Sequence, residues 1–287
     1  MKKIAFISDY FINDLIGGAE LTTDAIINFG AFRGFAIVSV HSQKVTVTAL
    51  EQSKDDYHFI VCNFSQLQDD AKIYMAKNCS YSIIEYDYKI CEYRSFELHE
   101  KYEGKPCDCE TRLSGKINSA FYGYAEKMWF MSHKQKNMIL DKVAVLKPEN
   151  CEVLSSVFSH GDLRFILSLK DNEKNNKYLI LDSNSPVKPN TQSVEYAKNN
   201  NLEYELISNL PYHELLIKMS TSKGLIFMPV ASDTCPRLVM EAKMLGCDLV
   251  LNEHVQHKDE PWFETQDSCF THMDSRADAF WSYYEQR

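Results

Sequence analysis

The chain lacks the long apolar segments that would place it in a membrane. No stretch of it approaches the roughly 20 apolar residues that a membrane-spanning helix needs. The N-terminus also lacks a signal-peptide pattern, because the apolar run that begins at Ile4 is short, Asp9 follows it, and no small-residue cleavage site appears. We therefore expect a cytoplasmic protein with no transmembrane segment, whose N-terminus forms a first β-strand.

Positive charge is also scarce. The sequence has 31 Lys and Arg against 40 Asp and Glu, a net charge of −9, and no Lys/Arg-rich run. Proteins that bind the nucleic acid backbone through charge need a basic surface, so nucleic acid is disfavoured as a partner. With 287 residues, 45% of them hydrophobic, the chain is long enough for two globular domains.

Cysteine is present in an arrangement that lacks the usual marks of a disulfide or metal framework. The nine cysteines are odd in number and scattered, which favours a reducing compartment. Only Cys107 and Cys109 are closely spaced, and neither a second pair nor histidines follow at zinc-like spacing. The sequence therefore indicates ordinary thiols and no metal site.

Apolar runs bounded by turn residues alternate with helical segments along the whole chain. This alternation is typical of α/β proteins with parallel sheets. The expected strands of the first half are Ile4–Ile7, Ala36–Val40, Phe59–Cys62, Tyr81–Ile84 and Met128–Met131, with helices near Glu20–Phe32 and Gly115–Glu126. The expected strands of the second half are Tyr178–Leu181, Glu203–Ile207, Gly224–Met228 and Asp248–Leu251. The pattern predicts two Rossmann-like domains.

The segment from Ile226 to Leu251 carries the clearest chemical pattern. An apolar strand enters a polar loop, the loop opens a helix, and the helix stops at Gly246 before another apolar strand. Asp233 in the loop and Glu241 in the helix can both border the N-terminal end of the helix. The amide groups and positive dipole there suit a phosphate, and carboxylates suit sugar hydroxyls. Phosphate with a polyol indicates a nucleotide-sugar. The alternative to a binding site is an ordinary buried β-α-β unit whose acidic side chains are solvated.

This segment resembles the donor-binding motif of retaining glycosyltransferases of the GT-B type, whose signature is Glu, seven residues, Glu, then Ala. Here the pattern stands as Asp233-x7-Glu241-Ala242, with Leu245–Cys247 as the helix end. The resemblance implies two Rossmann-like domains facing across a cleft, residues 1–160 on the acceptor side and 161–287 on the nucleotide-sugar side. A loosely matching strand at Val153–Ser159 would close the first domain. The final helix, about 275–287, would pack back on that domain or serve as a simple packing helix.

The resemblance assigns roles around this motif. Asp233 and Glu241 are the implied catalytic residues, Asp233 holding hydroxyls of the sugar and Glu241 the ribose. Two departures are that Asp233 replaces the family's first Glu, and that Ser183 stands where the family has an arginine. The implied donor-binding residues are Gly17, Gly18, Lys188, Thr234, Cys235, Pro236, Arg237 and Leu238. Of these, Lys188 and Arg237 would neutralise the diphosphate. The alternative without a function in binding is that Lys188 is a surface lysine and Arg237 a helix-capping arginine.

Other residues are weaker candidates for the same cleft. Tyr86 or Asp87 replaces a histidine that many relatives carry near the reacting centre, and Lys134 follows His133 at an expected helix start. The candidate cleft residues are Asp87, Lys89, His133, Asn209 and Leu210. Ordinary packing and capping are the alternatives for these residues.

The resemblance implies sugar transfer from a nucleotide-sugar with retention of configuration. No cofactor or metal is expected, because the helix dipole and cations stabilise the leaving phosphate. The acceptor stays open among a glycan, a lipid-linked molecule and a small molecule. One alternative is a degenerate binding protein of the same fold; another is an unrelated two-domain enzyme such as an epimerase or phosphorylase. A dinucleotide enzyme is disfavoured because no Gly-x-Gly-x-x-Gly follows the first strand.

Overall fold

The structure is a computed structural model that describes residues 3–286. The chain divides into two compact units. The first contains the residues up to Val157 together with those from Arg276 onward, and the second is Phe158–Ser275. The sequence places this boundary near residue 160.

The first unit contains a parallel sheet of six strands in the order β2-β1-β3-β4-β5-β6. Its strands are β1 (Lys3–Ser8), β2 (Ile37–His41), β3 (Tyr57–Val61), β4 (Tyr81–Glu85), β5 (Lys127–Phe130) and β6 (Cys151–Val153). Its helices are α1 (Gly18–Phe32), α2 (Val47–Ser53), α3 (Asp69–Asn78), α4 (Phe96–Glu103), α5 (Leu113–Gly123) and α6 (His133–Lys142), with 3-10 turns at Ser42–Lys44 (η1), Cys109–Thr111 (η2) and Pro148–Asn150 (η3).

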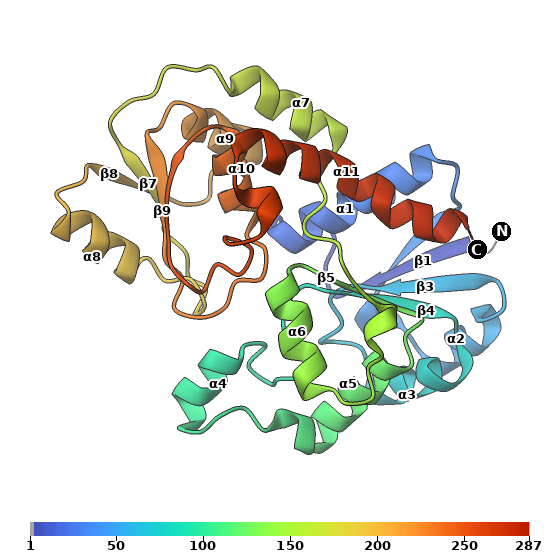
Figure 1. Cartoon of the computed structure of the whole chain (residues 1–287). Helices are drawn as coiled ribbons and strands as arrows, with labels where there is room; N and C mark the ends of the chain where they lie inside the picture. Colours follow the sequence, from blue (N-terminus) through green and yellow to red (C-terminus); the bar gives the residue numbers. More distant parts are fainter. Residues whose placement is uncertain (1–2, 287) are drawn as a thin grey trace. The chain divides into compact units, whose positions relative to one another are not determined.

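The central strands of this sheet are apolar on both faces, because helices cover both sides. Ala5 and Ile7 of β1 face a core shared with Phe59, Met75 and Phe121. Figure 1 shows α3 and α5 next to the strands that this core covers. The continuous apolar runs recognised in the sequence are therefore buried parallel strands.

The last helix, α11 (Gln266–Glu285), ends in the first unit and packs on α1. The Trp281 side chain is fully buried, and its indole N–H donates to the Ile26 carbonyl at 2.9 Å. The ring lies so close to Gly30 that a Cβ built there would come within 2.1 Å of it. Glycine at position 30 thus allows the tryptophan to lie directly against the α1 backbone.

The second unit contains a parallel sheet of four strands in the order β10-β9-β7-β8. Its strands are β7 (Tyr178–Leu181), β8 (Tyr204–Ile207), β9 (Gly224–Phe227) and β10 (Asp248–Leu251). Its helices are α7 (His160–Leu169), α8 (Thr191–Asn199), α9 (Tyr212–Ser220), α10 (Arg237–Met244) and the first part of α11, with a 3-10 turn at Pro261–Phe263 (η4). Tyr178, Ile180 and Ile226 pack against α8 through Ala197. The two parallel sheets confirm the predicted α/β class.

One local prediction is wrong. The strand expected at Val153–Ser159 ends at Val153, and the residues after it are extended but unpaired in a sheet. Leu154, Val157 and Phe158 are nevertheless buried, so their apolar character reflects burial rather than strand pairing. Within the described residues, no helix has both the length and the apolar character to cross a bilayer.

Candidate functional site

The loop that carries Asp233 is held by backbone hydrogen bonds. The N–H of Asp233 donates to the carbonyl of His254 at 2.9 Å, and the N–H of Gln256 donates to the carbonyl of Asp233 at 3.1 Å. This pair makes an isolated parallel bridge between Asp233 and Val255. The carboxylate therefore projects from a fixed backbone between β9 and α10.

Lys188 is the cation that the structure brings to Asp233. Its ammonium donates to Asp233 Oδ2 at 3.3 Å. The loop after β7 that carries Lys188 is tied to the loop after β9, because the N–H of Val230 donates to the carbonyl of Val187 at 2.9 Å. The Lys188 side chain stays 36% exposed and that of Asp233 14%, so both can reach a ligand.

The start of α10 lies next in the chain. Pro236 caps the helix with a φ of −65°, the angle that proline fixes, and its side chain gives no capping hydrogen bond. Thr234 and Cys235 before it are buried, and Leu238 is half-buried. The first amides of a helix have no acceptor within the helix and lie at its positive end, which favours an anion.

Arg237 and Glu241 form a buried ionic contact one helical turn apart. Arg237 Nε lies 3.4 Å from Glu241 Oε1, with 4% and 2% of the two side chains exposed. The Tyr212 hydroxyl donates to the same oxygen of Glu241 at 2.9 Å and accepts from the Arg237 guanidinium at 3.2 Å. The guanidinium carbon lies 3.7 Å from the centre of the Phe158 ring. Both predicted residues are thus engaged inside the second unit.

Burial dominates the electrostatics of this group. It raises the pKa of Glu241, and the charge of Arg237 with the Tyr212 hydrogen bond opposes the rise. Burial and the neighbouring Glu241 likewise raise the pKa of Tyr212, so the tyrosine keeps its proton as a hydrogen-bond donor. Asp162 Oδ2 lies 3.9 Å from Arg237 and adds a second, weaker negative charge.

Sequence reasoning missed Tyr212, Asp162 and Phe158. Only the position of Tyr212, two residues after the predicted Leu210, offered a signal. Asn209 in the loop before Tyr212 is exposed with a φ of 53°, and Leu210 is 36% exposed. Neither predicted loop residue contributes to the Arg237 group, whereas their neighbour does.

The first unit carries a separate polar group where β4 ends. Glu85 is fully buried and accepts from Lys89 Nζ at 2.9 Å and from the Tyr122 hydroxyl. Lys89 also contacts Asp87 Oδ1 at 3.0 Å, and Arg94 pairs with the other oxygen of Asp87. Asp87 and Lys89, both predicted, therefore belong to one network of alternating charges.

Burial raises the pKa of Glu85 to about 7, with the charge of Lys89 opposing the rise. The pKa of Asp87 is lowered: burial alone would raise it, and the charges of Lys89 and Arg94 outweigh burial. Opposite shifts in neighbouring carboxyls are typical of functional sites, and structural ion pairs produce them too.

Gln135 holds this group in place and was not found from the sequence. It is fully buried, and its side-chain N–H₂ donates to the carbonyls of Glu85 and Asp87 at 2.9 and 2.8 Å. His133, the predicted residue at the start of α6, is exposed. At the start of α6 the structure therefore brings Gln135 to the polar group, whereas His133 lies at the surface.

The remaining predicted residues lie as follows. Gly17 is the N-cap of α1, and a Cβ there would come within 2.5 Å of the Glu20 carboxylate. Gly18 begins α1 and is exposed. Tyr86 hydrogen-bonds Thr23 of α1 at 2.7 Å. In the second unit, the Ser183 hydroxyl accepts from the N–H of Ser185 at 3.1 Å, as a turn residue does.

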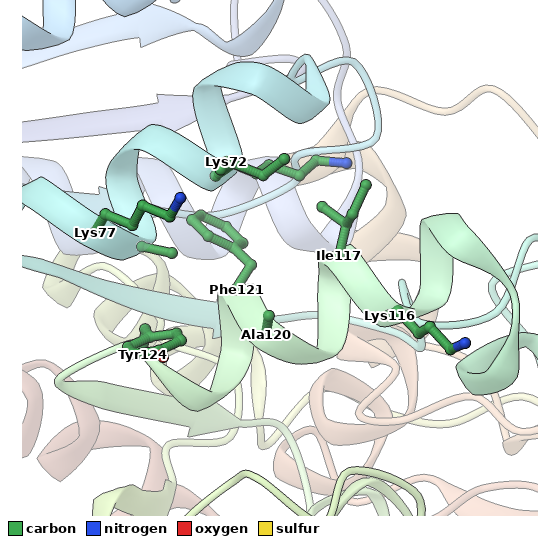
Figure 2. A pocket seen from close by; sticks show the side chains of 9 residues that line it. Lys72, Lys77, Lys116, Ile117, Ala120, Phe121 and Tyr124 are labelled. Atoms are coloured by element: carbon green, nitrogen blue, oxygen red, sulfur yellow. The ribbon is translucent and has the colours of Figure 1, made fainter.

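A cavity of about 550 Å³ lies between α3 and α5, with Lys72 and Lys77 near Phe121 and Lys116 further along α5 (Figure 2). It includes none of the residues predicted from the sequence. A smaller cavity of about 230 Å³ is lined in part by Lys89 and Arg94, and so adjoins the polar group of β4.

No protein-family model matches the chain, and no curated protein matches it. Solved structures do. HepE of Anabaena, with UDP and glucose, has a TM-score of 0.53 at 12% identity, covering 97% of this chain and 95% of HepE. The catalytic domain of starch synthase IV from Arabidopsis thaliana has a TM-score of 0.59 at 7% identity, covering 99% and 98%. AviGT4, a glycosyltransferase of avilamycin A biosynthesis, has a TM-score of 0.53 at 9% identity, and the match covers 97% of this chain and 92% of AviGT4. The chain therefore has a GT-B fold.

Proposed function

We propose that this chain is a glycosyltransferase that moves a sugar from a nucleotide-sugar to an acceptor. The Lys188 and Asp233 pair at the start of α10 carries the proposal, because it sets a partly exposed cation and carboxylate beside a helix N-terminus. The fold supports it: the similar HepE structures contain UDP with glucose or UDP-glucose, and the starch synthase structure contains ADP and acarbose.

In this proposal the donor diphosphate binds at the amides of Cys235, Arg237 and Leu238, and Lys188 offsets the charge that develops on the leaving phosphate. Asp233 holds hydroxyls of the sugar. The leaving phosphate assists attack on the same face, so the configuration is retained without a metal. Gly17 and Gly18 would allow a ligand close to the start of α1.

Glu241 is proposed to hold the nucleotide ribose. Its carboxyl is 2% exposed and already accepts from Tyr212. Arg237 neutralises this carboxyl, so its charge serves the donor site chiefly by orienting Glu241 rather than by contacting phosphate. A residue that orients another contributes through geometry.

The alternative is a protein that binds a nucleotide or sugar without transferring it. Two observations favour it. Ser183 stands where the resembled family has an arginine, and its hydroxyl is used within its own turn. Asp233 is shorter by one methylene than the glutamate of the motif. The acceptor, in the enzymatic case, is a glycan, a lipid-linked molecule or a small molecule; the acidic chain disfavours nucleic acid.

The experiment combines binding and turnover. Thermal unfolding is followed with UDP-, GDP- and ADP-sugars, since a ligand that binds only the folded chain raises its apparent stability. Mass spectrometry then follows release of the nucleoside diphosphate, in wild type, Asp233→Asn, Glu241→Ala and the exposed control Glu195→Gln on α8. We expect binding and slow release by wild type and by the control, and a loss of release of at least about tenfold in the other two.

The outcomes distinguish a glycosyltransferase from a protein that only binds the nucleotide or sugar. Binding without release under all conditions supports the binding protein. A chain that binds no nucleotide-sugar, or a Glu241→Ala variant that turns over like wild type, contradicts the roles proposed here.

A further inference from the structure

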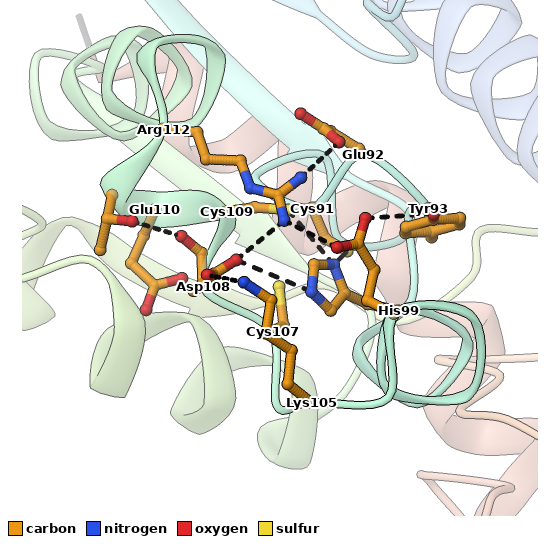
Figure 3. A network of polar contacts seen from close by, with 12 residues as sticks. Cys91, Glu92, Tyr93, His99, Lys105, Cys107, Asp108, Cys109, Glu110 and Arg112 are labelled. Atoms are coloured by element: carbon orange, nitrogen blue, oxygen red, sulfur yellow. Dashed lines mark hydrogen bonds and ion pairs between the residues drawn. The ribbon is translucent and has the colours of Figure 1, made fainter.

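Three cysteines and a histidine meet in the connection between β4 and α5. Cys91 lies in the turn after β4, His99 in α4, and Cys107 and Cys109 in the stretch that leads into η2 (Figure 3). All four side chains are buried, and their nearest possible ligand atoms lie within 4.8 Å of one another. The sequence pattern is Cys-x7-His-x7-Cys-x-Cys. The seven-residue gaps are longer than those of common zinc motifs, so the sequence alone did not indicate a metal site.

The distances fit a single tetrahedral ion. His99 Nδ1 lies 3.4 Å from Cys109 Sγ and 3.9 Å from Cys91 Sγ. With zinc bonds of about 2.3 Å to sulfur and 2.0–2.1 Å to nitrogen, the edges of a regular tetrahedron are about 3.6 Å between sulfur and nitrogen. The four donors thus need only small shifts to surround one ion. Their compactness favours one ion over an iron–sulfur cluster.

The histidine is oriented as a metal ligand is. Its Nδ1 faces the sulfur atoms, and its buried Nε2 has no hydrogen-bond partner among the described residues. Asp108 Oδ1 lies 3.7 Å from this Nε2. Histidines that bind a metal usually donate their second N–H to a carboxylate, which fixes the ring. Buried polar atoms without partners are rare, so simple thiol packing accounts poorly for His99.

A second layer of charge surrounds the group, as Figure 3 shows. Arg112 contacts Asp108 at 3.0 Å, and Lys105 contacts the other oxygen of Asp108 at 2.5 Å. The ammonium of Lys142 donates to the carbonyl of Cys107 at 2.5 Å. The three cations are paired with carboxylates, Arg112 also with Glu92 and Glu103 and Lys142 with Glu110, so these ion pairs hold the segment around the cysteines in place.

The segment also needs a stabilising element. Between β4 and α5 it contains one short helix and one 3-10 turn. Tyr88 and Ile90 join the core of the first unit, whereas Cys91, Cys107 and Cys109 form a separate small group packed with Phe96. Long connections with little regular secondary structure are uncommon in compact domains. A structural metal supplies folding free energy to such segments.

We propose that Cys91, His99, Cys107 and Cys109 bind a structural zinc ion. Each thiol that binds gives up its proton, and His99 binds as the neutral imidazole through Nδ1. Four protein ligands leave no open position, so the ion has no part in sugar transfer. The site rests on its own residues and is independent of the proposed function.

The site would also position the polar group of β4. Cys91 lies two residues after Lys89, and the N–H of Arg94 donates to the carbonyl of Cys91 at 2.9 Å. Fixing Cys91 therefore fixes the turn that presents both cations to Asp87.

The test measures metal content in the full chain, purified without chelator. We expect about one zinc per chain by mass spectrometry in wild type, and less than about a tenth of that in Cys109→Ser and His99→Ala. Cys151→Ser is the matched control, because Cys151 is buried outside the group and its thiol donates to the Lys147 carbonyl, a bond that serine can keep. It should retain the zinc. His99→Cys should retain it too, since four thiolates also bind zinc.

Two further measurements guard against variants that misfold. Wild type refolded with Co²⁺ should show the near-ultraviolet absorption of thiolate bound to cobalt, and Asp108→Asn should bind zinc about 10–100-fold more weakly. Wild type that is folded yet neither contains nor takes up zinc contradicts the proposal. Equal zinc loss in the Cys151→Ser control, iron in place of zinc, or a Cys91, Cys107 or Cys109 disulfide in protein kept reduced would also overturn it.

Discussion

The ammonium of Lys188 lies 3.3 Å from a carboxylate oxygen of Asp233, across 45 positions of sequence. The loops that carry them follow β7 and β9, which are neighbours in the sheet of the second unit. Parallel strands bring the loops at their carboxyl ends together, which explains the contact. Because the Lys188 side chain is 36% exposed, replacing it tests for a ligand at the start of α10 with little disturbance of the core.

Lys188→Ala is expected to weaken the binding of a nucleoside diphosphate sugar about 10–100-fold, because a charge-assisted hydrogen bond contributes roughly 1.5–3 kcal/mol. Isothermal titration calorimetry measures the change. The matched control is Lys198→Ala, which removes an exposed lysine at the end of α8. Equal affinity in wild type and Lys188→Ala would remove Lys188 from the site.

Arg237→Met is expected to destabilise the chain by about 3–5 kcal/mol, because it leaves the buried Glu241 without its cation. The double variant Arg237→Met with Glu241→Gln should recover part of the loss, since no charge then remains buried. Urea unfolding measures both. Arg164→Met, an exposed arginine on α7, is the control. A change below about 1 kcal/mol in Arg237→Met would show that the ionic contact is unimportant.

Glu85 makes the stability of the chain depend on pH. Because burial raises the pKa of this carboxyl from 4.5 to about 7, the folded chain keeps a proton that the unfolded chain has lost within that range. The free energy of unfolding contributed by Glu85 is therefore highest below pH 4.5 and falls as pH rises to about 7, by roughly 1–3 kcal/mol.

Glu85→Gln should abolish this dependence. Denaturant unfolding at several pH values in wild type and the variant measures it, and the difference between their unfolding free energies should change between pH 4.5 and 7. The exposed Glu51→Gln on α2 is the control. Parallel pH profiles for wild type and Glu85→Gln would contradict the shifted pKa.

Gly30→Ala is expected to destabilise the chain by about 1–3 kcal/mol, because the new methyl would overlap the Trp281 ring. Gly161→Ala is a matched control on another helix, where a Cβ would meet only the Ser159 hydroxyl at 3.6 Å. That variant should be neutral or more stable, since alanine favours a helix. Thermal unfolding compares the two. Similar melting temperatures for Gly30→Ala and wild type would mean that Trp281 can move away.

The local patterns of the sequence located most strands. The runs at Tyr81–Ile84 and Tyr178–Leu181 agree with β4 and β7 within one residue, because strands of a buried parallel sheet must be apolar on both faces. The strand predicted at Val153–Ser159 was wrong, because a buried extended segment has the same apolar composition as a strand. The strand-loop-helix frame around Asp233 was visible for a similar reason: its apolar runs, its proline and Gly246 are local signals.

The sequence by itself determined the α/β class and the segment that carries Asp233 and Glu241. Only the tertiary structure decided which residues meet them: Lys188 at Asp233, and Tyr212 with Arg237 at Glu241. It alone brought His99 to three cysteines. The physical reason is the distance along the sequence over which each effect acts. Backbone periodicity and turn preferences act over a few neighbouring residues, whereas these contacts arise when packed strands and helices bring distant loops together.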